Sequence, residues 1–313
     1  MNSITRPKNW TAVLFVAIAA TIWGLDGVVR EKVSDQASST QIVFLETIIG
    51  WFAIFPIILH RRKRFMENLK RVRRQEVLHF FIAALLGSLM GSLCFTRAIQ
   101  ELGTGSAIWF QVIQPFVVVI LAGKFLKEKP SKFVGWVGIW ILANAFLIAS
   151  PTLIAQADPD SSARGISFMG VVYGMGAMIF WGFSTVSGKY LCNRLSPDFI
   201  VFGRWGIASI IFGLAILVQG EATHLISIEF LKENWAELLL IGAVLGSFPY
   251  LSYYTGLRVL PASVATFVEL LYVVVTIGVS AAASGAEIHI LQLVGAFSIL
   301  VAVGLYVRSE IQN

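Results

Sequence analysis

Hydrophobic residues along this chain gather into long windows that are separated by short polar segments. A helix needs about 20 mainly apolar residues to cross about 30 Å of hydrocarbon. Such windows lie at about residues 11–30, 40–59, 78–97, 104–123, 133–150, 167–188, 197–218, 236–257, 262–283 and 290–308. Because hydrocarbon offers the backbone no hydrogen-bond partners, the pattern predicts an all-α, polytopic membrane bundle of ten transmembrane helices.

The segments between these windows are too short to hold a soluble catalytic domain. The longest, near residues 60–77, 151–166 and 219–235, each have fewer than about 20 residues. The chain is 57% hydrophobic and 13% charged, with a mean hydropathy of +0.77. An average soluble domain has about 25% charged residues. The composition therefore excludes a soluble protein, and any activity must lie within the bundle.

Basic residues concentrate on one side of the predicted bundle. The segments 61–74 and 124–132 carry many Lys and Arg residues, whereas the opposite loops carry few, among them Arg30 and Lys32. Lys and Arg in short loops favour the cytoplasmic side. The distribution predicts a multi-pass protein of a cell membrane, a bacterial inner membrane by its short loops, with both termini in the cytoplasm. Topology explains the basic excess, so no nucleic-acid partner is expected, and anionic lipid is the expected contact.

The second half of the chain repeats the first. A shift of 158 residues places Trp23 on Trp181, and it places Ile-Val-Phe at 42–44 on the same triplet at 200–202. We expect two related five-helix units, at 11–150 and 167–308. The GxxxG pairs of the third and eighth helices, Gly87/Gly91 and Gly242/Gly246, align instead at a shift of 155.

Five is an odd number of membrane crossings, so the second unit enters from the opposite side and forms an inverted repeat. Two inverted halves can exchange conformations, which makes outward-open and inward-open states similar in energy. The pattern therefore indicates alternating access. The alternative is a duplication that only enlarged a scaffold.

Several motifs recur in the same order in both halves. They are AATIWG at 19–24, AMIFWG at 177–182, CFTRAIQELGTGSAIWFQVIQP at 94–115 and YYTGLRVLPASVATFVELLYV at 253–273, with Glu128 and Glu287 before the last helix of each half. In these features the chain resembles the drug/metabolite transporter superfamily, specifically two copies of the EamA-type domain. The resemblance covers nearly the whole chain. It implies a central cavity and transport of amino acids, related metabolites or nucleotide-linked compounds.

The chain also departs from the pattern of that family. The family often has an Arg early in the second helix of each repeat; Arg204 matches it, but the first half has Glu46. The family's proline in the fourth helix is present as Pro115, and Val273 replaces it in the second half.

Four ionisable residues fall inside predicted spans, where a charge requires a partner or a role. They are Asp26, Glu46, Arg204 and Glu269. Glu46 and Arg204 are equivalent under the repeat, and each lies roughly 10 Å deep by helical rise, so we expect them to meet near the pseudo-twofold axis. Either they form an ion pair that fixes the packing of the halves, or Arg204 holds a substrate carboxylate while Glu46 holds an amino group or a coupling proton.

The other two charges have open interpretations as well. Asp26 is a proton-coupling carboxylate, or an interfacial charge that reaches toward Arg30 or Lys32. Glu269, together with Glu46, would suit a cationic substrate, for which nearby aromatic rings offer cation–π faces. The aromatic candidates are Trp109, Tyr250, Tyr253, Tyr254 and Tyr272.

Two amides in the fourth helix complete the candidate site. Gln111 and Gln114 lie beside Pro115, which frees a backbone carbonyl, so they either satisfy that carbonyl or bind a ligand in the cavity. The four histidines show no metal-ligand spacing, and the chain has no P-loop. We therefore expect no metal, no cofactor and no enzymatic activity.

These observations predict a secondary transporter of small polar metabolites, with amino acids or related compounds as the first candidates. An organic-cation or choline-like amine carrier is the alternative substrate class, and a non-transporting membrane scaffold or receptor is the alternative type of protein. The expected partners are a small-molecule substrate and the lipid bilayer. The sequence leaves open whether the chain is a monomer or a homodimer.

Overall fold

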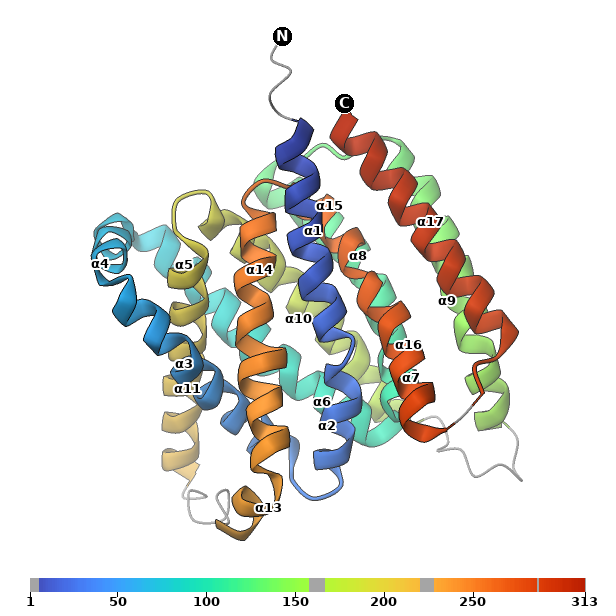
Figure 1. Cartoon of the computed structure of the whole chain (residues 1–313), viewed down its shortest axis with the longest axis horizontal. Coiled ribbons are helices and arrows are strands. Elements are labelled where there is room, and N and C mark those ends of the chain that lie inside the picture. The colour runs from blue at the N-terminus through green and yellow to red at the C-terminus, as the bar shows by residue number, and fades with distance from the viewer. Residues whose placement is uncertain (1–5, 158–166, 220–227, 286, 313) are drawn as a thin grey trace.

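The computed structural model describes residues 6–157, 167–219, 228–285 and 287–312, and all its regular elements are helices (Figure 1). Within this part of the chain, 10 segments are long and apolar enough to cross a membrane. They are Asn9–Ser34, Ser39–His60, Arg74–Leu102, Thr104–Leu126, Phe133–Pro151, Phe168–Cys192, Pro197–Val218, Ile228–Leu257, Ala262–Ala283 and Ile290–Ile311. The predicted number and positions of the spans are confirmed.

Several spans consist of more than one helix. The first half contains α1 (Arg6–Trp23), α2 (Asp26–Ser34), α3 (Ser39–His60), α4 (Arg62–Arg71), α5 (Arg74–Ile82), the π-helix η1 (Ala83–Gly91), α6 (Ser92–Leu102), α7 (Thr104–Ala107), α8 (Trp109–Leu121), the π-helix η2 (Ala122–Leu126) and α9 (Phe133–Ala157). The second half contains α10 (Phe168–Cys192), α11 (Pro197–Gln219), α13 (Ile228–Leu239), the π-helix η3 (Leu240–Ser247), α14 (Phe248–Leu257), α15 (Ala262–Glu269), α16 (Leu271–Ser284) and α17 (Ile290–Gln312).

The two halves are oppositely oriented. In Figure 1, α1 runs away from the face that carries both termini, whereas α10, the first helix of the second half, begins on the opposite face and runs back. The odd number of spans per half produces this inversion, as the sequence predicted.

The repeat extends to helical irregularities. The third span of each half contains a π-helix, η1 in the first and η3 in the second. The fourth span of each half is divided into two helices, at Ile108 between α7 and α8 and at Leu270 between α15 and α16. Broken and π-helical segments within a membrane occur where the backbone lines a cavity or a functional site. The irregularities therefore indicate where to look for a site.

The first span is also broken, and here the halves differ. α1 ends at Trp23 and α2 begins at Asp26, whereas the equivalent α10 is continuous. Thr276 of α16 donates a hydrogen bond of 2.9 Å from Oγ1 to the carbonyl of Gly24, inside the break. A Cβ at Gly24 would lie 2.5 Å from Cβ of Val275, so the close approach of α16 requires glycine there. The break thus brings polar residues of α2 to the centre of the bundle.

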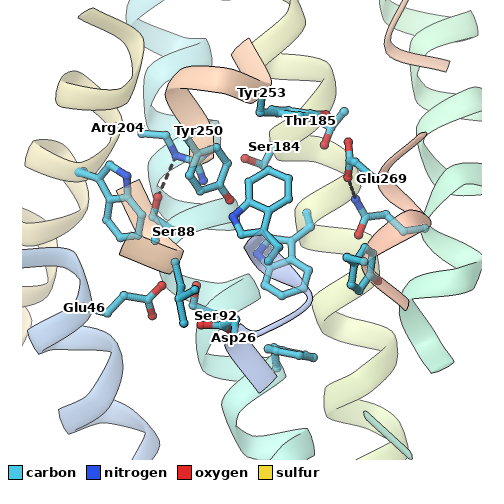
Figure 2. Close-up of a pocket in the computed structure, with 18 of the residues that line it drawn as sticks. Asp26, Glu46, Ser88, Ser92, Ser184, Thr185, Arg204, Tyr250, Tyr253 and Glu269 are labelled. Atoms are coloured by element: carbon cyan, nitrogen blue, oxygen red, sulfur yellow. Dashed lines mark hydrogen bonds between the residues drawn. The ribbon is translucent and has the colours of Figure 1, made fainter. Parts of the chain in front are cut away.

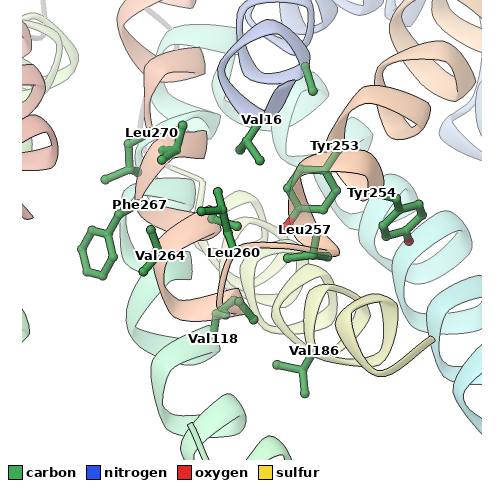
Figure 3. Close-up of a cluster of buried hydrophobic side chains, with 14 of the residues drawn as sticks. Val16, Val118, Val186, Tyr253, Tyr254, Leu257, Leu260, Val264, Phe267 and Leu270 are labelled. Carbon is green, nitrogen blue, oxygen red and sulfur yellow. The ribbon is translucent and has the colours of Figure 1, made fainter. Parts of the chain in front are cut away.

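A buried cluster of apolar side chains joins both halves beside the polar centre (Figure 3). Val16 of α1 and Val118 of α8 meet residues of the second half, namely Val186 of α10, Leu257 and Val264, and all five are buried. By contrast, α9 and α17 form a peripheral pair on one side of the bundle (Figure 1). The core therefore fixes the helices that surround the central cavity.

Candidate functional site

A cavity of about 100 Å³ lies between the two halves (Figure 2). Aromatic, hydroxyl and charged side chains line it. They are Trp23, Asp26, Arg30, Glu46, Ser88, Ser92, Phe95, Ile108, Gln114, Trp181, Ser184, Thr185, Arg204, Trp205, Leu245, Gly246, Tyr250, Tyr253, Tyr254, Glu269 and Tyr272. The cavity adjoins the break between α1 and α2, η1 and the divided fourth and ninth spans.

Arg30 of α2 connects three elements on one wall of this cavity. Its Nε and Nη2 atoms donate to Asp26, at 2.9 and 3.0 Å, in a two-bond fork. Its Nη1 donates to Oε2 of Glu46 in α3 and to Oγ1 of Thr96 in α6, both at 3.0 Å. Arg30 is 3% exposed, so the two carboxylates offset a desolvated cation.

The structure corrects two inferences about these charges. The sequence places Arg30 in a polar loop, but it lies within the first span, because α2 continues that span after a short turn. The expected meeting of Glu46 with Arg204 was also wrong. Among the described residues Glu46 pairs with Arg30, and the hydrogen bonds of Arg204 go elsewhere. Asp26 reaches Arg30, as one of its two interpretations proposed.

Arg204 of α11 lies on another part of the wall, held by neutral groups. Its Nε donates to Oγ of Ser88 in η1 at 3.0 Å, and its Nη1 donates to the hydroxyl of Tyr254 in α14 at 2.7 Å. The guanidinium carbon lies 4.1 Å from the ring centroid of Tyr250, a cation–π geometry. Nη2 has no hydrogen-bond partner among the described residues. This buried cation therefore retains one donor for a ligand.

Glu269, at the end of α15, lies on the opposite side of the cavity from Arg204 (Figure 2). Nε2 of Gln114 donates to its Oε2 atom at 3.2 Å. The hydroxyl of Tyr253 interacts with the same carboxylate, but Oε1 forms no well-formed hydrogen bond within the part of the chain that the structure describes. Tyr250 and Ser184 lie between Glu269 and Arg204 in the close-up. The cavity therefore has a donor side and an acceptor side, with an aromatic middle.

Most of the predicted site residues reach this cavity. Asp26, Glu46, Gln114, Arg204, Tyr250, Tyr253 and Glu269 all line it. Trp109 and Gln111 do not belong to its lining. Gln111 is buried nearby in α8, and neither of its amide atoms has a hydrogen-bond partner among the described residues. The two glutamines three residues apart thus face different surroundings.

Sequence reasoning missed Arg30 and the three tryptophans of the cavity. Trp23 and Trp181 are equivalent under the repeat and both line the cavity, so their equivalence was a usable signal. Nε1 of Trp181 donates to the carbonyl of Gly87 in η1 at 3.0 Å, which fixes the indole. Arg30 follows Asp26 by four residues, the spacing of a helical ion pair.

The repeat also explains why the two arginines differ in their partners. Gly188 is the counterpart of Arg30, and a Cβ at Gly188 would lie 2.6 Å from Cε1 of Tyr254. Tyr254 therefore fills the space beside Gly188, where the first half has the side chain of Arg30. Thr96 and Tyr254 are themselves equivalent, and each accepts a hydrogen bond from the arginine of its half.

Comparison with known proteins identifies the family of this fold. The model of the EamA-like transporter family matches residues 10–150 and again residues 168–308. The chain belongs to the EamA-like transporter family. The predicted membership in the drug/metabolite transporter superfamily, with two EamA repeats, is confirmed, and this EamA protein is a multi-pass membrane transporter.

Individual relatives agree with this assignment along almost the full chain. The EamA protein is 25% identical over 296 residues to the riboflavin transporter ImpX of Fusobacterium nucleatum, covering 93% of this chain and 95% of the relative. It is 23% identical over 306 residues to the uncharacterized transporter YxxF of Bacillus subtilis, covering 97% and 91%. A solved crystal structure has the same fold, with a TM-score of 0.67 at 12% identity over 97% of this chain and 96% of that chain.

Proposed function

We propose that this EamA protein is a secondary transporter that binds its substrate in the central cavity and moves it by alternating access. The cavity lies between inverted repeats and adjoins their broken spans, the position at which secondary transporters of inverted-repeat architecture bind substrate. The buried charges support a polar cargo, because charged groups inside a membrane mark substrate and ion pathways.

The substrate class that we propose is a planar heteroaromatic compound with hydrogen-bonding groups at both ends, riboflavin being the first to test. One observation carries this proposal: an aromatic cavity separates the unpartnered Nη2 of Arg204 from the unpartnered Oε1 of Glu269. A ring system can stack in the middle, while Arg204 donates to a carbonyl and Glu269 accepts from an N–H or hydroxyl. The full-length similarity to a riboflavin transporter supports the same class.

An aromatic amino acid is the second candidate, favoured by the size of the cavity. About 100 Å³ is well below the roughly 300 Å³ at which pockets for drug-sized ligands begin, so a flavin requires side chains to move on loading. An amino acid would place its carboxylate on Arg204, whose planar fork suits that group. The organic-cation alternative loses its second anchor, because Glu46 is engaged by Arg30.

Binding to the purified protein separates these candidates. Riboflavin fluorescence should be quenched when the ring stacks on the tryptophans and tyrosines of the cavity, and Arg204→Gln should weaken binding at unchanged protein stability. Phenylalanine and choline serve as competitors. Quenching displaced by phenylalanine favours a shared site, and displacement by choline favours the cation carrier. Thermal stabilisation by phenylalanine without any response to riboflavin would reject the flavin class in favour of the amino acid.

A further inference from the structure

A carboxylate of the first repeat caps a helix of the second. Oε1 of Glu128 accepts a hydrogen bond from the backbone N–H of Ala262 at 2.8 Å. Its Oε2 accepts from the backbone N–H and the hydroxyl of Ser263, at 3.1 and 2.8 Å. Ala262 and Ser263 are the first residues of α15, and both are buried. Glu128 therefore forms a three-bond contact between the repeats, which we name the Glu128 latch.

Local geometry directs Glu128 into this contact. Lys127, the C-cap residue that follows η2, has a φ of 57° in the left-handed region, which is unusual for a non-glycine residue. The residue before α15 is Pro261, which provides no side-chain cap. The first N–H groups of that helix therefore donate their hydrogen bonds to Glu128 instead. An anion at a helix N-terminus is stabilised both by hydrogen bonds and by the helix dipole.

The Glu128 latch lies on the face that carries both termini, where other polar contacts also join the repeats. Asn68 accepts from the backbone N–H of Ser196 at 2.9 Å, and Arg194 donates to Glu76 at 2.8 Å. The repeats are therefore bonded to each other on this face, as they also are on the opposite face through Gln36 and Asn234.

The second repeat has a carboxylate one position after the counterpart of Glu128, without the same contact. Glu287 precedes the last helix of its half, as Glu128 does, and the repeat relates Ala262 and Ser263 to Thr104 and Gly105 at the start of the span Thr104–Leu126. Glu287 is exposed and forms no hydrogen bond with any residue that the structure describes. Each face thus has a carboxylate, but of the two only Glu128, on the termini-bearing face, accepts hydrogen bonds from the other repeat among the described residues.

We propose that Glu128 and Glu287 are the paired gate residues of the transport cycle. While the termini-bearing face is closed, Glu128 holds the start of α15. In the mirror-image state Glu128 releases α15, and Glu287 becomes the carboxylate that joins the repeats on the opposite face. Exchanging one set of bonds for an equivalent set keeps the two states similar in energy. The inference rests on alternating access, which belongs to the proposed function.

Distance measurements between spin labels test the pair without any substrate. Labels on cysteines at Lys129 and Val259 span the termini-bearing face, and labels at Lys32 and His289 span the opposite face, in a background with Cys94→Ala and Cys192→Ala. Glu128→Gln should increase the population with the longer Lys129–Val259 distance roughly tenfold, because charge-assisted hydrogen bonds are lost. Glu287→Gln should shift the same distance in the opposite direction, and the double variant should return it toward the starting distribution.

The matched control is Glu310→Gln, which removes another carboxylate that joins the repeats on the same face but lies in the peripheral α17, where it accepts from the N–H of Ser131 at 3.0 Å. It should leave both distance distributions unchanged. If Glu128→Gln does not fold, Ser263→Ala removes one bond of the latch and should give a smaller shift of the same sign. Unchanged distances in the folded Glu128 variants, or shifts of one sign in both glutamate variants, would overturn the gate pair. A shift without any transported solute would reject the proposed function alone.

Discussion

The guanidinium of Arg30 and the carboxylate of Glu46 form a buried ion pair, with 3.0 Å between Nη1 and Oε2, although the repeat relates neither residue to the other. Glu46 corresponds to Arg204, and Arg30 corresponds to Gly188. The first repeat thus pairs Glu46 with an arginine of its own. Because of this, Arg204 in the second repeat has no carboxylate partner within salt-bridge distance among the described residues and keeps a donor for a ligand.

Removal of Arg30 should destabilise the protein. In Arg30→Met, Asp26 and Glu46 remain in the membrane interior without their cation, a loss that typically costs roughly 3–5 kcal/mol when a buried pair is broken. Glu46→Gln should cost less, since Arg30 retains its two bonds to Asp26. Thermal unfolding in detergent checks the order of the two variants. Equal stability of Arg30→Met and the unchanged protein would contradict the structural role.

Arg204 should determine substrate affinity rather than stability of the fold. Arg204→Lys keeps the charge but loses the planar fork, and we expect affinity to fall by about 10- to 100-fold, the equivalent of one charged hydrogen bond. Ser88→Ala, which removes only a group that orients the guanidinium, should give a smaller loss. Titration of riboflavin against purified protein provides both values, and full affinity in Arg204→Lys would refute the direct contact.

Gly87 should not tolerate a side chain. A Cβ there would lie 2.7 Å from Nη2 of Arg204 and against the hydroxyl of Ser184, so Gly87→Ala should displace the guanidinium. Overpacking of this kind costs about 1–3 kcal/mol, and substrate binding should fall with it. Gly278→Ala is the matched control, because a Cβ at that helical position meets no atom within 4 Å. Loss of binding in both variants would point to a general effect of helix glycines.

Both termini should lie in the cytoplasm, because the basic segments 61–74 and 124–132 belong to the termini-bearing side. A cysteine introduced at Lys63 should be protected from a membrane-impermeant thiol reagent in intact cells, whereas one at Lys32 should react. Opening the cells should make the first cysteine reactive as well. The reverse pattern would place the termini outside.

The sequence predicts the spans and the repeat well, because both depend on hydrophobicity over long windows. It does not predict the break between α1 and α2, since Gly24 and Leu25 continue an apolar run and the break depends on Thr276 and Val275 of a distant helix. The partner of Glu46 was missed for a related reason. Repeat symmetry related Glu46 to Arg204, but it contained no information on Arg30, which has a glycine as its counterpart.

The sequence predicts only part of the cavity lining, and the reasons for this are physical. Gln114 and Gln111 lie three residues apart on α8, and only helix rotation decides which one faces the cavity. The sequence indicates Trp109 as a site residue by its aromatic ring alone. The indoles that line the site belong to Trp23, Trp181 and Trp205. Their packing against η1 and α14 depends on tertiary contacts rather than on local pattern.

Transport of riboflavin into liposomes that contain the purified protein tests the central claim most directly. We expect riboflavin to accumulate in these liposomes, Arg204→Gln to abolish uptake while the variant remains folded, and Gly278→Ala to transport normally. Uptake that is equal in empty liposomes, or uptake that Arg204→Gln leaves unchanged, would contradict the claim that this EamA protein carries a flavin-like substrate through the central cavity.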